Sequence, residues 1–291
     1  MKPAVFTYVA PHSREEALEA ARRFGSDGKI LAGGQSLVPL MAMRLARPAT
    51  IIDLNRIPDL AYIKAARGGL AIGAMTRQRT AETHRLVLER LPLLADALRW
   101  VGHAQIRSRG TIGGSLAHAD PSAELPAVAA VLGGRFVVVS TRGERIIDTA
   151  QFFTGYLTTA IQPHEMLVEV QLPAPPAGAG WAFQEIARRH GDFAIAGVAV
   201  VLRLDADRRC ADARLAFTGV GPGPVRATNA EAYLKGKRLS AAVVAEACRM
   251  AQAALDPDGD IHASAAYRTH VAGVLAARAL RQAAERAKGQ A

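Results

Sequence analysis

Two glycine-rich segments hold the residue types best suited to chemistry in this sequence, Ala32–Ser36 (AGGQS) and Thr111–Ser115 (TIGGS). Consecutive glycines after a short apolar run let the backbone approach a ligand closely. A run of their N–H groups forms a concave site for an anion such as phosphate. Ser36 is expected to cap a short helix over residues 37–43, whose N-terminus would face the same anion. One Gly-Gly pair is common in loops, but two such segments predict a diphosphate held from two sides.

The other reactive side chains do not form a catalytic or metal site. Cys210 and Cys248 are the only two cysteines, which is too few for an iron–sulfur cluster or a structural zinc site. We expect both to be buried and inert. His118 and Asp120 share a face of a strand-like stretch without a third ligand, and neither His118 nor His103 has a neighbour that completes an acid–base pair. Redox chemistry would therefore require an organic cofactor or a partner chain.

Size and composition predict a globular protein. The chain has 291 residues, 50% of them hydrophobic, so two domains are more plausible than one. It has no run of 18 uncharged apolar residues, which excludes an integral membrane segment of the helical kind. Its N-terminus lacks the long hydrophobic stretch of an export signal, so we expect a cytoplasmic location.

The net charge of +10 raises the question of a nucleic acid partner. The lysines and arginines are scattered among acidic and apolar neighbours, and aromatic residues do not alternate with them as they do in surfaces that stack on bases. We therefore expect no nucleic acid partner. The basic surface is either simply solvated or docks an acidic partner.

The first half of the chain predicts a small β-α-β unit followed by a mixed region. A capping box at Ser13–Glu16 begins a helix that ends at Gly25, between strands. Thr76 is expected to cap the segment that reaches His84, and Pro92 to begin the next helix. Expected strands are 6–9, 29–32, 51–54 and 166–172, expected hairpins are 60–64 with 70–73 and 136–140 with 144–147, and further expected helices are 92–101 and 126–132.

The stretch from Pro173 to Gly180 (PAPPAGAG) is the best domain boundary. The expected strands after it are 181–187, 198–204 and 213–218, and the expected helices are near 229–234, 241–254 and 267–287. Strands followed by helices indicate an α+β domain. We expect a first domain over 1–175, with one lobe over about 1–55 and a second over about 56–175, and a C-terminal domain over 176–291.

With these segments placed, the chain resembles a known family. The matching stretches are Ala32–Met41, Gln105–Ser115 continuing to Ala119–Pro121, and Ala187–Ala194, in that order. They resemble the FAD-binding medium subunit of the molybdenum hydroxylases, of the carbon monoxide dehydrogenase and xanthine dehydrogenase type. The resemblance implies an α+β chain: a two-lobed FAD-binding domain of the vanillyl-alcohol oxidase-like (PCMH) type, then a smaller α+β domain of the carbon monoxide dehydrogenase flavoprotein type.

The resemblance also implies the cofactor site. Glu124 would lie near the sugar-like part of FAD, Leu167 beside the adenine, and Asp192 with Phe193 close to the flavin ring. From the residues alone, Glu124 is equally an ordinary solvated carboxylate, Asp192 equally the cap of a turn, and Leu167 a core residue. Some relatives have Tyr in place of Phe193 and Lys in place of Gln184. The full set of expected FAD-binding residues is Leu31, Ala32, Gly33, Gly34, Gln35, Ser36, Leu37, Thr111, Gly113, Gly114, Ser115, Ala117, Asp120, Glu124, Leu167, Gln184, Asp192 and Phe193.

The function that the resemblance implies is electron transfer. FAD would be bound without a covalent link, and molybdopterin and two [2Fe-2S] clusters would reside in a large and a small partner subunit, in a dimer of heterotrimers. The flavin carries out such chemistry without a catalytic side chain. The alternative is a stand-alone flavin oxidase of the vanillyl-alcohol oxidase type. Such enzymes commonly tether FAD through His or Cys, where this chain has Gln35 and Ser36.

Overall fold

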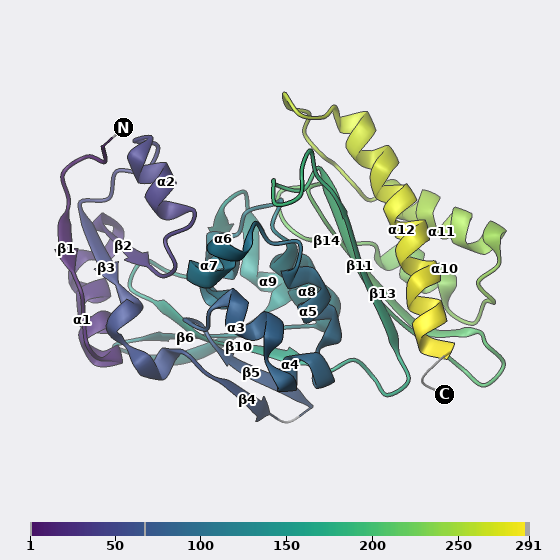
Figure 1. Cartoon of the computed structure of the whole chain (residues 1–291), viewed down its shortest axis with the longest axis horizontal. Coiled ribbons are helices and arrows are strands. Elements are labelled where there is room, and N and C mark those ends of the chain that lie inside the picture. Colours follow the sequence, from purple (N-terminus) through teal and green to yellow (C-terminus); the bar gives the residue numbers. More distant parts are fainter. Residues whose placement is uncertain (1, 67, 289–291) are drawn as a thin grey trace.

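The computed structural model describes residues 2–66 and 68–288, in three parts that follow one another along the molecule (Figure 1). An N-terminal lobe lies at one end, a central part with most of the short helices lies in the middle, and a sheet covered by long helices lies at the other end. Among the helices of the described residues, none combines the length and the apolar character needed to cross a membrane.

The N-terminal lobe is a three-stranded parallel sheet with strand order β1-β3-β2. Its elements are β1 (Thr7–Val9), α1 (Arg14–Phe24), β2 (Gly28–Leu31) and β3 (Thr50–Asp53). The Ser13 Oγ accepts the Glu16 N–H at 3.2 Å, and Gly25 ends α1 with a φ of +49°. The predicted β-α-β unit is therefore confirmed, and so is the capping box, except that the Glu16 carboxylate accepts the N–H of His12 at 2.8 Å rather than that of Ser13.

The helix expected after the first glycine segment is α2 (Leu37–Ala42). Ser36 occupies its N-cap position but already has helical dihedral angles, with φ −107° and ψ −47°, and its hydroxyl makes no capping hydrogen bond. The prediction that Ser36 caps this helix was wrong. A capping side chain needs an extended backbone to turn back onto the N–H groups of the first turn.

The sheet of the central part has five antiparallel strands in the order β4-β5-β10-β6-β7. The two predicted hairpins form its two sides, and the predicted strand 166–172 lies between them in the middle of the sheet. The strands are β4 (Ile63–Ala66), β5 (Gly69–Gly73), β10 (Met166–Pro173), β6 (Arg135–Ser140) and β7 (Gly143–Asp148), and a separate two-stranded ribbon joins β8 (Phe153–Gly155) to β9 (Thr158–Thr159).

Seven short helices accompany this sheet, and two predictions about them were wrong. The Thr76 hydroxyl bonds to the Tyr62 backbone, accepting from N and donating to O, so it does not cap a helix. The second glycine segment is the first turn of a helix rather than a loop. The helices are α3 (Gln78–Thr83), α4 (Arg85–Arg90), α5 (Pro92–Leu98), α6 (Ala104–Arg109), α7 (Ile112–His118), α8 (Glu124–Leu132) and α9 (Thr149–Phe152).

The C-terminal part is an antiparallel sheet with strand order β11-β12-β13-β14. One face packs against the C-terminal helices, which lie on the outer side in Figure 1, and the other contributes Phe183, Ala199, Val201 and Ala216 to the core of the central part. The elements are β11 (Gly180–Ile186), β12 (Ala196–Leu204), β13 (Cys210–Thr218), β14 (Val225–Arg226), α10 (Thr228–Leu234), α11 (Ala241–Gln252) and α12 (Ala265–Lys288).

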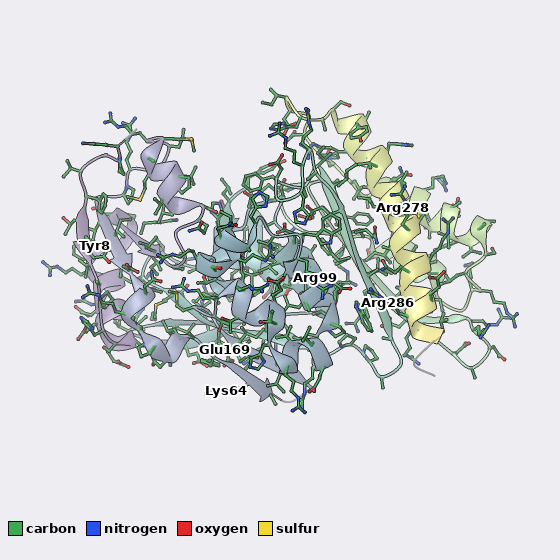
Figure 2. The ribbon with its side chains drawn as sticks, in the orientation of Figure 1. Tyr8, Lys64, Arg99, Glu169, Arg278 and Arg286 are labelled. Carbon is green, nitrogen blue, oxygen red and sulfur yellow. The ribbon has the colours of Figure 1, made fainter. Side chains whose placement is uncertain are left out.

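Polar contacts reinforce this shared core. The Arg286 guanidinium of α12, labelled in Figure 2, donates to Asp96 Oδ2 of α5 at 2.8 Å and to the Trp181 carbonyl at 2.9 Å, and it also lies over the Trp181 ring. The C-terminal part is therefore attached to the central part by the apolar face of its sheet and also by α12, which lies on the opposite face.

Candidate functional site

The two glycine segments lie against each other. A Cβ built on Gly33 would be 2.3 Å from the Arg109 carbonyl oxygen and 2.8 Å from the Gly110 Cα. A Cβ built on Gly114 would be 3.2 Å from the Cβ of Ala32. The two segments, predicted to hold one diphosphate from two sides, are thus adjacent in the structure. At Gly33 the missing side chain also allows one backbone to pack closely on another. The sequence analysis attributed the need for a glycine here to the ligand alone.

The first segment exposes its backbone N–H groups. Gly34 has a φ of +76°, a left-handed conformation that favours glycine, and it reverses the chain directly after β2. The N–H groups of residues 33–36 have no acceptor among the described residues, while the Gln35 side chain donates to the Gly33 carbonyl at 3.2 Å. Successive unpaired N–H groups beside a left-handed residue form a concave anion site. This geometry fits a phosphate group.

The second segment uses its N–H groups internally. The Gly113 N–H donates to the Ala74 carbonyl at 2.9 Å, and the Gly114 N–H donates to the Oγ1 of Thr111 at 3.0 Å, which caps α7. The Ser115 N–H donates to the Thr111 carbonyl at 3.1 Å. The prediction that these N–H groups face a phosphate was therefore wrong. What this segment offers is the half-buried Ser115 hydroxyl, which has no hydrogen-bond partner among the described residues.

A side-chain bridge joins the two segments. The Asn55 Nδ2 donates to the Ala32 carbonyl of the first segment at 2.8 Å. The Asn55 Oδ1 accepts from the Arg77 guanidinium at 2.6 Å, and Arg77 also donates to the Arg109 carbonyl, just before the second segment. Burial, together with the charge of Arg109, lowers the pKa of Arg77. Asn55 and Arg77 therefore fix the distance between the N-terminal lobe and the central part.

Asp53, the last residue of β3, positions Asn55 of this bridge. The Asp53 Oδ1 accepts the Asn55 N–H at 2.9 Å, and its Oδ2 accepts the hydroxyl of Tyr8, labelled in Figure 2, at 2.6 Å. This hydrogen bond raises the pKa of Tyr8. Sequence reasoning missed these residues, although a signal existed. Leu31 pairs with Asp53 in parallel strands, so the carboxyl ends of β2 and β3 meet at the edge where ligands bind in such sheets.

Two acidic residues of the expected FAD-binding set, Asp120 and Glu124, lie beyond α7, and Glu124 is the one expected near the sugar-like part of the cofactor. The Asp120 Oδ1 accepts the Ser122 N–H at 2.9 Å in a tight turn, and its Oδ2 lies 4.0 Å from the Nε2 of His118. Burial lowers the pKa of His118. Glu124 begins α8 and is buried, and this burial raises its pKa to about 7. Among the described residues, no three possible metal ligands cluster.

Leu167 lies in β10, where the carbonyl of its neighbour Val168 accepts the N–H of Ala74 at 2.9 Å beside the second glycine segment, whereas Gln184 lies in the C-terminal sheet. Leu167 is 6% exposed and belongs to the core, at an irregularity in the pairing of β10 with β6. The Gln184 Nε2 donates to Gln282 Oε1 of α12 at 2.7 Å, on the face of the C-terminal sheet that carries the long helices. The structure therefore does not bring Gln184 together with the expected FAD-binding residues of the central part.

Asp192 and Phe193 belong to an exposed loop after β11. The Asp192 N–H donates to the Arg189 carbonyl at 3.1 Å, which gives a turn, and Phe193 is 72% exposed. The loop approaches the central part, since a Cβ on Gly191 would lie 2.5 Å from the ring of His103 at the start of α6. Because α6 leads into the second glycine segment, the exposed Phe193 lies on a loop that reaches the same part of the molecule.

The family models divide the chain as the fold does. A model described as the FAD binding domain in molybdopterin dehydrogenase matches residues 4–175, and one described as the CO dehydrogenase flavoprotein C-terminal domain matches residues 181–283. The chain belongs to this family. It is an FAD-binding subunit of an oxidoreductase, as the resemblance predicted, and the unpaired N–H groups of the first segment fit the diphosphate of that cofactor.

Relatives of the whole chain agree. It is 43% identical to the "6-hydroxypseudooxynicotine dehydrogenase complex subunit alpha" of Paenarthrobacter nicotinovorans, over 99% of this chain and 97% of the relative. It is 38% identical to the carbon monoxide dehydrogenase medium chain of Hydrogenophaga pseudoflava, over 97% and 98%. A solved carbon monoxide dehydrogenase from that organism superposes with a TM-score of 0.96 at 40% identity, covering 98% of this chain and 99% of that one.

Proposed function

We propose that the chain is the electron-transfer subunit of a molybdenum-containing hydroxylase. It would accept electrons from [2Fe-2S] clusters of a small partner and pass them to an external acceptor. The observation that carries this proposal is the pair of glycine segments in contact, in a chain that belongs to an FAD-binding subunit family over residues 4–175. When bound, FAD supplies the redox chemistry, and the protein supplies binding and orientation.

The diphosphate of FAD is placed at the first segment in this proposal. The N–H groups of Gly33, Gly34, Gln35 and Ser36 would bind it, and the Ser115 hydroxyl would approach from the central part. Neighbouring positions would enclose the rest of the cofactor. These are Leu31, Ala32, Leu37, Thr111, Gly113, Gly114, Ala117, Asp120, Glu124, Leu167, Asp192 and Phe193. Gln184, whose side chain bonds to Gln282 of α12, would contribute no side-chain contact. The corresponding domains are 1–175 and 176–291.

The bond to FAD is non-covalent in this proposal. The first segment carries Gln35 and Ser36, neither of which is a nucleophile that tethers flavins. Both cysteines are buried in the C-terminal part, and burial raises the pKa of each to about 11, which suppresses the reactive thiolate. A stand-alone flavin oxidase is not favoured, because residues 181–283 match a carbon monoxide dehydrogenase flavoprotein domain.

The proposed electron-transfer role requires partner subunits. Several relatives are named as medium chains or as subunits of dehydrogenase complexes. Two cysteines cannot ligate a [2Fe-2S] cluster in the usual four-thiolate way. A large molybdopterin-binding subunit and a small [2Fe-2S] subunit would complete the enzyme, as a dimer of heterotrimers in the cytoplasm.

The substrate would be chosen by the partner. Relatives of similar identity are named for carbon monoxide, caffeine, nicotine and glyceraldehyde, which share no chemistry that one conserved pocket would recognise. We therefore place substrate recognition outside this chain.

Expression alone and with its partners tests the proposal. The isolated chain is expected to bind one FAD per chain, to release all of it on acid precipitation, and to oxidise no small alcohol or phenol. Coexpression with a large and a small partner is expected to give a complex that turns over substrate. Substrate oxidation by the isolated chain at an ordinary enzymatic rate would instead establish the oxidase alternative.

A further inference from the structure

Glu185 is a buried carboxyl group that the sequence reasoning did not single out. It lies in β11, is 7% exposed, and its Oε2 has no hydrogen-bond partner in the part of the chain that the structure describes. Its neighbour Phe183 contributes to the core shared with the central part, so this alternating face of β11 points toward the FAD-binding domain. A buried carboxylate without a partner is costly, so the group either binds a proton or faces a ligand.

The sheet places Glu185 beside the N-terminus of α8. Glu185 pairs with Gly197, which pairs with Thr218, so the three residues form one row across the sheet. A Cβ on Gly197 would lie 3.5 Å from the Glu185 Cγ and 2.8 Å from the Thr218 Cγ2, so both side chains flank the gap above this glycine. The Thr218 hydroxyl bonds to the Ala123 carbonyl at 2.7 Å.

Ala123 is the residue before Glu124. The row therefore ends directly under the loop that carries Glu124, and two strand spacings separate the Thr218 and Glu185 backbones by about 10 Å. Glu124 is also 7% exposed. Two carboxyl groups buried in one junction resist simultaneous ionisation, because each charge disfavours the other.

We propose that the buried Glu185 keeps its proton at the junction that carries Glu124, beside the FAD site, and that loss of this proton weakens FAD binding. The second part rests on the FAD site proposed above. A further negative charge at this junction would repel the diphosphate of the cofactor. Two charges about 10 Å apart, in an effective dielectric constant of about 20, interact strongly enough to change an affinity by about tenfold.

The surrounding charges agree with a retained proton. Burial is the main cause that raises the pKa of Glu185, and the charge of Glu124 raises it further. Near Glu124, Asp120 raises its pKa and Arg107 lowers it, but Arg107 already pairs with Glu82 at 3.0 Å. The Nε2 of His118 lies 4.0 Å from the Oδ2 of Asp120.

The other buried cation of this region, Arg268 of α12, bonds elsewhere through its terminal nitrogens. It donates to the Ile195 carbonyl at 2.7 Å and to Asp260 Oδ2 at 2.8 Å, and its Nε donates to none of the described residues, Glu185 included. No described cation is therefore bonded to Glu185.

Infrared spectroscopy of the apo-protein tests the retained proton without FAD. The carbonyl stretch of a protonated carboxyl group is expected at about pH 8 in the wild type, where an exposed glutamate is ionised. It should persist in Glu124→Gln, which leaves Glu185 buried and protonated, and it should be absent from the double variant with Glu185→Gln. A wild-type spectrum identical to that of the double variant would overturn the retained proton.

Thermal unfolding provides an independent readout. A raised pKa in the folded state means that the folded protein binds the extra proton, so the stability that this proton contributes is present at low pH and is lost as the pH rises. Relative to the wild type, Glu185→Gln should gain melting temperature between about pH 5 and about pH 9. The exposed Glu144→Gln is the matched control and should follow the wild type. Parallel curves for all three proteins would contradict the proposal.

FAD titration tests the effect of this proton on the cofactor. The wild-type Kd for FAD is expected to rise about tenfold between about pH 8 and about pH 10, where Glu185 loses its proton and Glu124 is already ionised, and Glu144→Gln should rise equally. Glu185→Gln should have a flat profile over the same range. Equal profiles for the wild type and Glu185→Gln would overturn the effect on FAD binding but not the retained proton. If no variant bound FAD, the proposed cofactor site would fail, and the infrared spectra would still decide whether Glu185 is protonated.

Discussion

The first glycine segment has backbone N–H groups for which the described part of the chain offers no acceptor, whereas the second uses its own to cap a helix and to bond to Ala74. Both have the same Gly-Gly core, and both sit at the junction between the N-terminal lobe and the central part. The difference shows that a glycine pair serves two distinct purposes. In one segment it prepares a ligand site, and in the other it allows close packing of a helix against a strand end.

The two segments also depend on different supports. The first follows a strand of the parallel sheet, and the Asn55 side chain fixes its position by donating to the Ala32 carbonyl. The second is held by Thr111, whose hydroxyl caps α7, and by Ala74, against which Gly113 packs. Substitutions at these supports should therefore separate ligand binding from folding.

The largest effect is expected at Gly113. A Cβ there would lie 2.4 Å from the Ala74 Cβ and 2.7 Å from its Cα, so Gly113→Val must displace α7 from the sheet. We expect a loss of about 3 kcal/mol or more in the free energy of unfolding and the loss of flavin. Gly33→Val should also lose flavin, because its Cβ would clash with the Arg109 carbonyl.

Gly155→Ala is the matched control, since a Cβ there meets no atom within 4 Å. Melting temperature and flavin content of the purified variants provide the measurements. Near-normal flavin content in Gly33→Val or Gly113→Val would show that the cofactor site lies elsewhere.

A smaller effect is expected from the bridge between the segments. Asn55→Ala removes the bonds to the Ala32 carbonyl and to Arg77, and thus the link between the two parts. We expect FAD affinity to fall by about tenfold and stability by about 1 kcal/mol. Asn229→Ala, at an exposed position of α10, should change neither quantity in fluorescence titration or denaturant unfolding. An unchanged Kd for Asn55→Ala would mean that the bridge does not position the site.

Thr111 and Ser36, one hydroxyl residue from each segment, should give opposite results. Thr111→Ala removes a helix cap and should cost about 1 kcal/mol of stability. Ser36→Ala removes no capping bond, so stability should hardly change, while FAD affinity should fall by about fivefold if its hydroxyl contacts the diphosphate. Denaturant unfolding measures the stability of both variants, and FAD titration measures their affinity for the cofactor. Equal stability losses for the two variants would contradict the assigned roles.

The smallest effect on stability is expected at Phe193. This side chain is 72% exposed, so Phe193→Ala should change the free energy of unfolding by less than about 0.5 kcal/mol. If Phe193 lies beside the flavin ring, the variant should still bind FAD but shift its absorption band or its potential. An unchanged spectrum and an unchanged potential would exclude that contact.

Local patterns predicted most of the fold. The capping box at Ser13, the hairpins of the central sheet and the strand 166–172 are confirmed because alternation and turn chemistry act over a few residues. The helix over 112–118 was missed because two glycines are poor helix formers, and only the packing of Gly113 on Ala74 stabilises it. Thr76 was misread for a similar reason, since its hydroxyl bonds to the distant Tyr62.

The candidate site was only partly predictable. The glycine segments were visible in the sequence, and so was their likeness to a family. The bridge through Asn55 and Arg77 joins residues 22 positions apart, and Glu185 meets the Glu124 loop only through the register of three strands. Such contacts depend on tertiary structure, so residue types and spacing did not reveal them. Gln184 illustrates the converse, because its side chain points to α12.

Backbone hydrogen exchange with and without FAD tests the central claim most directly. The N–H groups of residues 33–36 should exchange fast in the apo-protein and slowly once FAD is bound, because the diphosphate becomes their acceptor. Those of residues 113–115 should be slow in both states, since Ala74 and Thr111 already accept them. Unchanged exchange at residues 33–36 in a chain that demonstrably holds FAD would contradict the account.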